Sequence, residues 1–411
     1  MADEASAARL RVLRLREFRW FFTGQTLSTF GDYLALPALA IAVLDRNGSA
    51  SDIGLVLGAR SVPIVVFMLL GGVIADWLPR DRVMVGADLA RLTGQGATAL
   101  LLLGGHAPVW QLMCLQAVNG TATAMFTPAV SGLVQQTTPP ELRQAANALR
   151  STSQSAAMIA GPLVATLLIL SVGSAWAVAV DAATFGLSAV CLSRLRLTSR
   201  GPREVLHLIR DLREGWSELT SRTWAWSLIL AASVSNMLAT TFTVLGPVVS
   251  ERYLNGGGAW GVVMTAFGAG AVTGGLVALH VRPSRPLRFA VLVGALFALP
   301  ALVMSQASSV VPIAAGAFLG GVGLMVFDPL WETVLQREVP ATALSKVSAY
   351  EWFGSYLGQP LGLMLAGPVA AHLGLRGTLL AAGLANLTVS LAPLAVRDVR
   401  DYTAAPNSTK G

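Results

Sequence analysis

Charged residues are scarce in this sequence of 411 residues, of which 12% are Asp, Glu, Lys or Arg and 54% are hydrophobic. An average soluble protein contains about 25% charged residues. A chain with so few charges cannot hide its apolar side chains inside one soluble core. The composition therefore excludes an ordinary soluble domain and predicts a membrane protein.

Cysteine and histidine are also rare. The two cysteines, Cys114 and Cys191, lie in apolar runs and form no CxxC pair, which argues against a disulfide framework and a metal site. The four histidines are scattered, and the predicted loops are short. Because a membrane enzyme would need acids or histidines clustered in a loop, we expect no enzyme, no metal and no cofactor.

Long apolar segments are abundant, and most are about 18 to 27 residues long, enough for a helix to cross a hydrocarbon core of about 30 Å. The alternating ten-residue pattern of a membrane β-barrel is absent. The sequence predicts an all-α integral membrane protein with twelve transmembrane helices. Their predicted starts lie near Phe18, Ile53, Val83, Trp110, Ala145, Ala175, Trp224, Ala259, Leu287, Val310, Ala349 and Gly377.

The net charge of +7 raises nucleic acid as a partner, but its distribution indicates membrane topology instead. When successive loops are assigned to alternate sides, the side of the termini holds 24 of the 29 Lys and Arg residues and the other side holds three. Arg60 and Arg91 lie inside spans. Because cytoplasmic loops carry the basic excess, both termini are predicted to be cytoplasmic. We expect a monomer in the inner (plasma) membrane, surrounded by lipid, with no nucleic acid partner.

The longest hydrophilic stretch divides the predicted spans six and six. The predicted parts are an N-terminal bundle (residues 1–196), an amphipathic linker (197–223) and a C-terminal bundle (224–411). The linker has apolar residues at helical spacing, among them Val205, Leu208 and Leu212. It either lies along the membrane surface or docks on the cytoplasmic helix ends, and the sequence leaves both possibilities open.

The two halves share a pattern beyond hydropathy. FTPAVSGLVQQTTP from Phe126 matches FDPLWETVLQREVP from Phe327 at an offset of 201 residues, and the glycine pair at Gly72 matches Gly275 at 203. Two matches at nearly the same offset predict two pseudo-symmetric six-helix bundles. Such parallel halves are a transporter architecture.

An ordered set of motifs covers nearly the whole chain: GGVIADWLPRDRV, ADLAR, FTPA, ELRQAANALR, AGPL, DAATFGLS and DLREGW. With this set the chain resembles the major facilitator superfamily. Within it, the chain resembles the twelve-span bacterial drug exporters of the macrolide-efflux and enterobactin-exporter type. The resemblance implies transport by alternating access.

The charged turn after the second span resembles the family signature Gly-x-Leu-Ala-Asp-Arg-x-Gly-Arg-Arg. Gly72, Ala75, Asp76 and Arg80 fit it, whereas Trp77 replaces its first arginine. By this resemblance, Asp76, Arg80 and Arg82 form a cytoplasmic gate that holds the outward-facing state closed. The topology rule alone explains the two arginines but not Asp76. Asp88 and Arg91, three residues apart on one helix face, are assigned to the same gate region as a local pair.

An ionisable residue deep in a span costs about 2.5 to 3.5 kcal/mol on insertion scales, so it needs a partner or a function. Asp32 and Arg60 are predicted at similar depth near mid-membrane. They form either a structural ion pair or a proton-coupling site. Proton coupling is assigned to Asp32, Arg60, Asp181 and Asp328, with the proton gradient as energy source.

Polar residues fall on single helix faces in several spans, spaced three or four residues apart. By resemblance, these faces line the central substrate cavity. The predicted cavity residues are Gln25, Ser28, Gln116, Asn119, Thr123, Asn236, Thr240, Trp352, Tyr356 and Gln359. Hydrogen bonding between helices is the alternative for each of them.

Gly161 and Pro162 resemble the core of the family's antiporter signature, and close packing of a kinked helix is the alternative. Together these features predict proton-coupled efflux of a moderately hydrophobic small molecule, such as an antibiotic, a siderophore or a secondary metabolite. An uncoupled facilitator or importer stays open, as do, with less support, a polytopic membrane enzyme and a transporter-like sensor.

Overall fold

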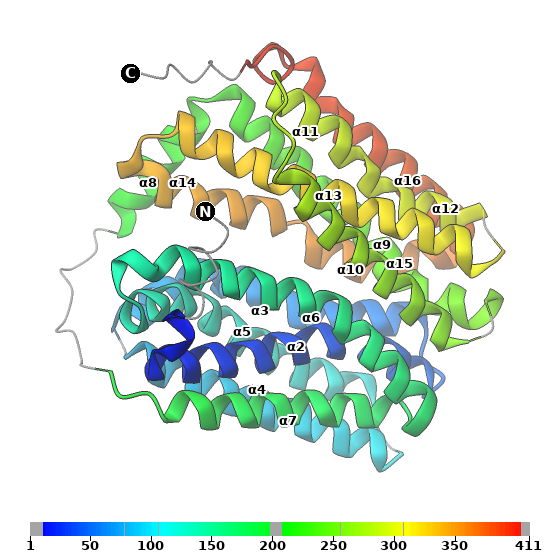
Figure 1. Ribbon diagram of the computed structural model, residues 1–411. Helices are drawn as coiled ribbons and strands as arrows, with labels where there is room; N and C mark the ends of the chain where they lie inside the picture. Colours follow the sequence, from blue (N-terminus) through cyan, green and yellow to red (C-terminus); the bar gives the residue numbers. More distant parts are fainter. Residues whose placement is uncertain are drawn as a thin grey trace. The chain divides into compact units, whose positions relative to one another are not determined.

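The computed structural model describes residues 11–77, 79–105, 107–197, 208–254, 256–306 and 308–403 (Figure 1). Within these ranges, side chains are described except at residues 68–77, 131, 208–212, 214, 341–343, 345–346 and 349. The described residues form helices and turns and contain no strand.

The first half contains six long helices: α2 (Arg16–Leu44), α3 (Ala50–Trp77), α4 (Arg80–Leu103), α5 (Val109–Thr137), α6 (Arg143–Val172) and α7 (Ser174–Ser193). A short 3-10 turn, η1 (Pro140–Leu142), precedes α6. At the start of α3, the backbone N–H of Asp52 donates to the Ser49 hydroxyl (3.2 Å), and the Ser49 N–H donates to the Asp52 carboxylate (2.7 Å). This reciprocal capping box fixes where the helix begins.

The remaining helices are α8 (Leu208–Thr220), α9 (Thr223–Tyr253), α10 (Gly257–Ala278), α11 (Pro286–Gly294), α12 (Leu299–Gln306), α13 (Val310–Glu338), α14 (Ala341–Tyr356), α15 (Gln359–Leu373), α16 (Leu375–Leu391) and α17 (Arg397–Arg400). Two 3-10 turns, η2 (Ala295–Ala298) and η3 (Ala392–Ala395), join α11 to α12 and follow α16.

All twelve predicted span starts fall inside helices. Among the described residues, nine helical stretches are long and apolar enough to cross a membrane. The helices α4, α5 and the pair α14–α15 are not among them. The helix α4 carries five ionisable side chains, which lower its hydropathy. The helices α14 and α15 are separate and each is shorter than 18 residues. The all-helical prediction is confirmed, while twelve crossings and two six-helix bundles stay a prediction.

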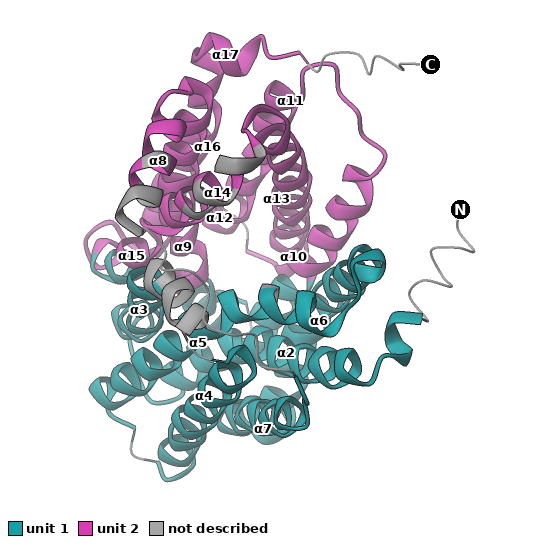
Figure 2. Ribbon diagram, turned by 90° about the vertical axis from the view of Figure 1, so that its left-hand side faces the viewer, with its two compact units in different colours: residues 1–205, 246–265, 363–368 teal, residues 206–245, 266–362, 369–411 magenta. Residues whose placement is uncertain are grey.

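The chain divides into two compact units, coloured in Figure 2. Unit 1 contains residues 1–205, 246–265 and 363–368, and unit 2 contains residues 206–245, 266–362 and 369–411. In unit 1, α2 packs against α6 and α7, α4 packs against α5 and α7, and α3 packs against α5. In unit 2, α13 packs against α11 and α12, while α16 packs against α12. The three predicted domain ranges, 1–196, 197–223 and 224–411, stay a prediction.

The internal repeat is visible in the backbone. Gly173 separates α6 from α7 with φ 97° and ψ 162°, and Gly374, 201 residues later, separates α15 from α16 with φ 75° and ψ 161°. Glycine suits this turn because side chains disfavour positive φ. Pro128 inside α5 and Pro329 inside α13 keep the same offset.

The linker helix α8 packs against α14 within unit 2. Leu219 is buried among Trp224 and its neighbours, and the ring of Trp216 lies 5.7 Å from that of Tyr350. These contacts support docking on helix ends, one of the two possibilities left open by the sequence. Val205 lies outside the described residues.

Candidate functional site

A layer of polar side chains crosses unit 1 between two apolar clusters. One cluster includes Phe18, Met84 and Leu133, and the other includes Leu34 and Leu102. Between them, five helices contribute charged, amide or hydroxyl side chains to the layer. These are Asp32 from α2, Arg60 from α3, Asp88, Arg91 and Gln95 from α4, Gln116 and Asn119 from α5, and Asp181 and Ser188 from α7. We call these nine residues the polar layer.

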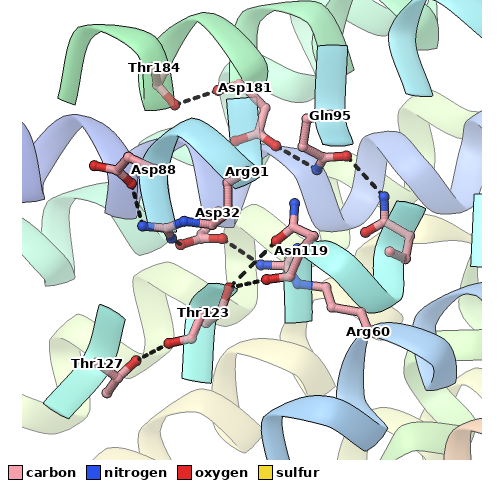
Figure 3. A network of polar contacts seen from close by, with 11 residues as sticks. Asp32, Arg60, Asp88, Arg91, Gln95, Asn119, Thr123, Thr127, Asp181 and Thr184 are labelled. Atoms are coloured by element: carbon pink, nitrogen blue, oxygen red, sulfur yellow. Dashed lines mark hydrogen bonds and ion pairs between the residues drawn. The ribbon is translucent and has the colours of Figure 1, made fainter. Parts of the chain in front are cut away.

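Arg91 joins two acids within the polar layer (Figure 3). It forms an ion pair with Asp88 on its own helix, and its Nη1 lies 3.4 Å from Asp32 Oδ2. Arg60 forms an ion pair with the other oxygen of Asp32. The Ser188 hydroxyl donates to Asp88 over 2.5 Å. The four charges therefore form a chain, Arg60–Asp32–Arg91–Asp88, across three helices.

Two aromatic rings hold the Arg91 guanidinium. Its central carbon lies 4.2 Å from the Phe126 ring centroid and 4.4 Å from that of Phe185. Arg91 is 1% exposed, and cation–π contacts are strongest when the cation is removed from water. The rings from α5 and α7 therefore fix Arg91 where it can reach both Asp88 and Asp32.

A second chain of hydrogen bonds runs through two amides to Asp181. Gln116 donates to Gln95 over 2.9 Å, and Gln95 donates to Asp181 Oδ2 over 2.7 Å. Asp181 is fully buried, and its Oδ1 has no hydrogen-bond partner among the described residues. This oxygen lies against the Cα of Gly31, where any side chain would collide with it.

The polar layer contains more acids than bases. Three carboxylates, Asp32, Asp88 and Asp181, accompany two guanidinium groups, and within the described part of the chain Asp181 forms no ion pair with either. A buried charge without a partner costs several kcal/mol, so burial favours a neutral form for one of the acids. Uptake of one proton would bring the net charge of the three carboxylates and two guanidinium groups to zero.

The predicted proton-coupling residues are partly brought together. Asp32, Arg60 and Asp181 belong to the polar layer, whereas Asp328 lies on α13 in unit 2. The predicted ion pair between Asp32 and Arg60 is present. The side chain of Asp32 is 28% exposed, while Asp88 and Asp181 are fully buried. Asp32 is therefore the most exposed acid of this layer.

The predicted gate residues occupy different places. Asp88 and Arg91 form their predicted pair, and the contact from Arg91 to Asp32 connects them to the proton-coupling set. Arg80 packs against Gly132 of α5, and Arg82 is exposed at the start of α4. The side chain of Asp76 lies outside the described residues. The gate role of these residues stays a prediction.

The predicted cavity residues make contacts within each unit. In unit 1, Gln25 accepts a hydrogen bond from Arg150 (2.8 Å), Ser28 and Asn119 are buried, and Thr123 donates to the Asn119 carbonyl (2.9 Å). Gln116 of α5 donates a hydrogen bond to Gln95 of α4, which is the bond between helices given as the alternative to a cavity role. The cavity role of each stays a prediction.

In unit 2, Asn236 donates to the Ser355 carbonyl over 2.9 Å, and Thr240 donates to the Met237 carbonyl over 2.6 Å. The rings of Trp352 and Tyr356 are stacked at 5.5 Å, and Trp352 is 55% exposed. Gln359 is half-buried at the start of α15. The stacked pair offers a flat apolar surface.

Gly161 and Pro162 are buried inside the continuous helix α6. A Cβ added at Gly161 would lie 2.6 Å from the Cβ of Tyr33 on α2. Gly161 therefore allows α6 to pack closely against α2, one residue away from Asp32. Close packing is the alternative to the antiporter role, which stays a prediction.

Sequence reasoning missed several contributors. Gln95 follows Asp88 and Arg91 on the same helix face, a spacing that would have placed it in the polar layer. Phe185 and Ser188 belong to the DAATFGLS motif, but the motif did not indicate their contacts with Arg91 and Asp88. Glu351 was also missed, although it is an acid in an apolar segment; it lies near Asp328 and accepts hydrogen bonds from Trp331 and Ser355. Within the described residues, no group of three or more His, Cys, Asp or Glu is placed to hold a metal ion.

Comparisons with known proteins agree with this fold. Residues 21–362 match the Major Facilitator Superfamily. Macrolide efflux protein A of Streptococcus pyogenes is 21% identical over 397 residues, with 93% of this chain and 96% of the relative covered. Multidrug efflux pump Tap of Mycobacterium tuberculosis is 24% identical over 401 residues, with 93% and 94% covered.

Solved structures share the fold at low identity. A peptide transporter, POT, aligns with a TM-score of 0.76 and 13% identity, covering 94% of this chain and 95% of that one. The nucleoside transporter NupG aligns with a TM-score of 0.74 and 12% identity, covering 93% and 99%. The fold, the apolar helices and the efflux relatives make this chain a multi-pass membrane protein of transporter type.

Proposed function

The chain belongs to the Major Facilitator Superfamily, and on that premise we propose that it exports a moderately hydrophobic small molecule in exchange for protons. The observation that carries this proposal is the polar layer of unit 1, in which three buried or half-buried acids accompany only two arginines. The names of the relatives, a macrolide efflux protein and a multidrug efflux pump, support the direction of transport.

Protonation of Asp32 would rearrange the chain of charges. Asp32 pairs with Arg60 of α3 and Arg91 of α4, and it is the most exposed acid of the polar layer. When Asp32 is neutral, Arg91 keeps Asp88 as its charged partner, whereas Arg60 loses its partner. The tie from α2 to α3 then weakens while the pair inside α4 persists. A proton thereby biases the packing of α2 against α3, as an alternating-access transporter requires.

Asp76, Arg80 and Arg82 would act as a gate at the cytoplasmic ends of these helices. The strong bias of Lys and Arg toward the side of the termini supports a cytoplasmic position for this turn and for both termini. Arg80 is anchored on α5 beside Gly132, which connects the turn to the helix that also carries Gln116 and Asn119. A change at the polar layer can therefore reach the gate through α4 and α5.

An aromatic surface in unit 2 supports the proposed substrate class. In unit 2, the stacked Trp352 and Tyr356 provide apolar contact, and Gln359 offers an amide nearby in sequence. Such a surface suits a flat or bulky apolar compound with few polar groups. An antibiotic, a siderophore or a secondary metabolite fits this description.

Transport into inverted vesicles tests the proposal. A panel that includes a macrolide and a siderophore is offered to vesicles with an imposed pH gradient, which is then collapsed. We expect accumulation of at least one compound with the gradient and its loss on collapse. Asp32→Asn should insert and fold but lose gradient-driven accumulation, whereas Asp398→Asn, an exposed acid outside the polar layer, should keep it.

Three outcomes would contradict the proposal. Undiminished gradient-driven accumulation by Asp32→Asn would remove Asp32 from coupling. Equilibration without any effect of the gradient would indicate an uncoupled facilitator or importer. Binding of a compound without movement across the membrane would indicate a sensor.

A further inference from the structure

A groove on unit 1 lies between the first turns of α4 and the middle of α5. Its cavity volume is about 630 Å³, within the roughly 300–1,000 Å³ of ligand pockets. Small residues form most of its floor: Gly86, Ala87, Ala90, Ala117, Thr121 and Ala122. The groove does not involve the residues of the polar layer.

The groove is charged at one end. Arg82 lines it from the first turn of α4, and Ala90 lies eight residues further, about 12 Å along the helix. Arg82 is exposed, and its side chain makes no ion pair with a described residue. The Thr121 hydroxyl already donates to the Ala117 carbonyl over 2.9 Å. Among the described residues that line the groove, the Arg82 guanidinium is therefore a charged group without an ion-pair partner, and the remaining lining is mostly apolar.

The helix end adds to this positive charge. Arg82 occupies the first turn of α4, a helix of 24 residues, and the N-terminal end of a helix carries partial positive charge. Leu89 and Val118, which are 48% and 47% exposed, flank the groove from α4 and α5. An exposed apolar face on a multi-pass membrane protein is surrounded by lipid chains. The ligand that matches is elongated, with an anionic head and an apolar tail.

The second half lacks these features at the corresponding positions. With the offset of 203 residues, Gly86 corresponds to Phe289, and Arg82 corresponds to Arg285, which lies 3.9 Å from Asp401. With the offset of 201, Ala117 corresponds to Phe318. Phenylalanines thus stand where the groove has glycine and alanine, and the arginine has an acidic neighbour. The internal repeat alone does not produce the groove.

We propose that this groove binds an anionic phospholipid, with its phosphate on Arg82 and one acyl chain along the small residues of α4 and α5. A second copy of the chain fits less well, since it would remove the exposed Arg82 guanidinium from water, which is costly for a charge. Anionic lipids concentrate in the cytoplasmic leaflet, and the proposed topology places Arg82 on that side. The proposal does not depend on the transported substrate.

Native mass spectrometry of the purified full chain in detergent tests the proposal. We expect phosphatidylglycerol to remain bound at concentrations at which phosphatidylcholine does not. Arg82→Gln should weaken phosphatidylglycerol binding about tenfold, the loss expected for one charge-assisted hydrogen bond. Gly86→Leu should fill the groove and weaken binding of both lipids.

Matched controls keep the result interpretable. Arg285→Gln removes the corresponding arginine, and Gly96→Leu adds the same side chain to α4 at a position with open space around it. Both should bind phosphatidylglycerol as the unmodified chain does. Equal binding of the two lipids, equal loss in Arg82→Gln and Arg285→Gln, or retained binding in Gly86→Leu would overturn the proposal. So would equal binding of inorganic phosphate alone, or a dimer that Gly86→Leu dissociates.

Discussion

In the first half of the chain, α4 contacts its neighbours through Asp88, Arg91 and Gln95, whereas the residues 203 positions later are Val291, Gly294 and Ala298. The same change occurs on α5 and α13. Gln116 of α5 is hydrogen-bonded to α4, and its counterpart 201 positions later is Ala317.

The second half uses glycine contacts in place of these charges. Gly294 lies against Phe327, Gly320 lies against Pro300, and Gly321 lies against the backbone of α10 at Phe267. Small residues allow helices in a membrane to approach closely and gain van der Waals contact. Among the described side chains of the second half, the ion pairs lie at partly exposed positions and not between buried faces of the core helices. The charges of the first half are not required for packing as such, which supports a role for them in function.

The largest expected effect comes from removing Arg91. Arg91→Met leaves Asp88 buried without its cation, and breaking a buried pair in this way costs about 3–5 kcal/mol. We expect a strong fall in the detergent unfolding midpoint. The double variant Asp88→Val with Arg91→Met removes both charges and brings the site closer to the apolar second half, so it should recover part of the loss.

A double variant as unstable as Arg91→Met would weaken the comparison. The cost would then arise from lost contact with Phe126 and Phe185 rather than from an unpaired charge. A transport assay separates the role of these charges in stability from their role in function. The double variant should recover stability but still transport poorly, because it lacks the complete chain of charges.

Apolar segment length was sufficient to predict the helices, since every expected span start lies inside one. Depth along the helix was also sufficient to predict the pair of Asp32 and Arg60. The contact between Arg91 and Asp32 was not predicted, because depth alone does not tell which neighbour a helix face meets. That choice depends on the packing of α4 against α7 and α5, where Phe185 and Phe126 hold the guanidinium.

Glu351 shows a second limit. It lies in an apolar segment beside Trp352 and Tyr356. The two aromatic residues predicted a binding surface there, and the acid next to them was not considered. Its nearness to Asp328 depends on how α14 packs against α13. The spacing of residues within one helix does not predict this packing. Asn386 likewise accepts a hydrogen bond from Ser235 over 2.6 Å, a contact across 151 residues.

A glycine contact of the second half should be the next most sensitive. Gly321→Ala would place a Cβ 2.7 Å from the backbone nitrogen of Ala271 and closer still to the carbonyl of Phe267. Overpacking of this kind costs about 1–3 kcal/mol. Gly275→Ala in α10 is the matched control, because nothing lies within 4 Å of its added Cβ. Equal unfolding midpoints for the two variants would show that α10 and α13 can move apart, contrary to the proposed packing.

The smallest expected effect concerns the C-terminal end of the second half, where a polar contact lies at the end of a helix. The Tyr402 hydroxyl donates to Glu338 at the end of α13 over 2.6 Å. Burial, followed by this bond to a carboxylate, raises the pKa of Tyr402 from 10.0 to about 12. The neutral phenol is thus favoured in the folded chain, so its contribution is fully present below pH 10 and is lost as pH rises through about 12.

Tyr402→Phe should lower stability by about 0.5–1.5 kcal/mol at neutral pH, toward the lower end because the site is partly exposed. The difference in unfolding midpoint between the unmodified chain and Tyr402→Phe should shrink between pH 10 and pH 12, while other tyrosines titrate equally in both. Equal unfolding midpoints for the two chains across this range would show that the ring of Tyr402, rather than its hydroxyl, holds the C-terminal segment on α13. The second half would then depend on apolar contact at its end as well as in its core.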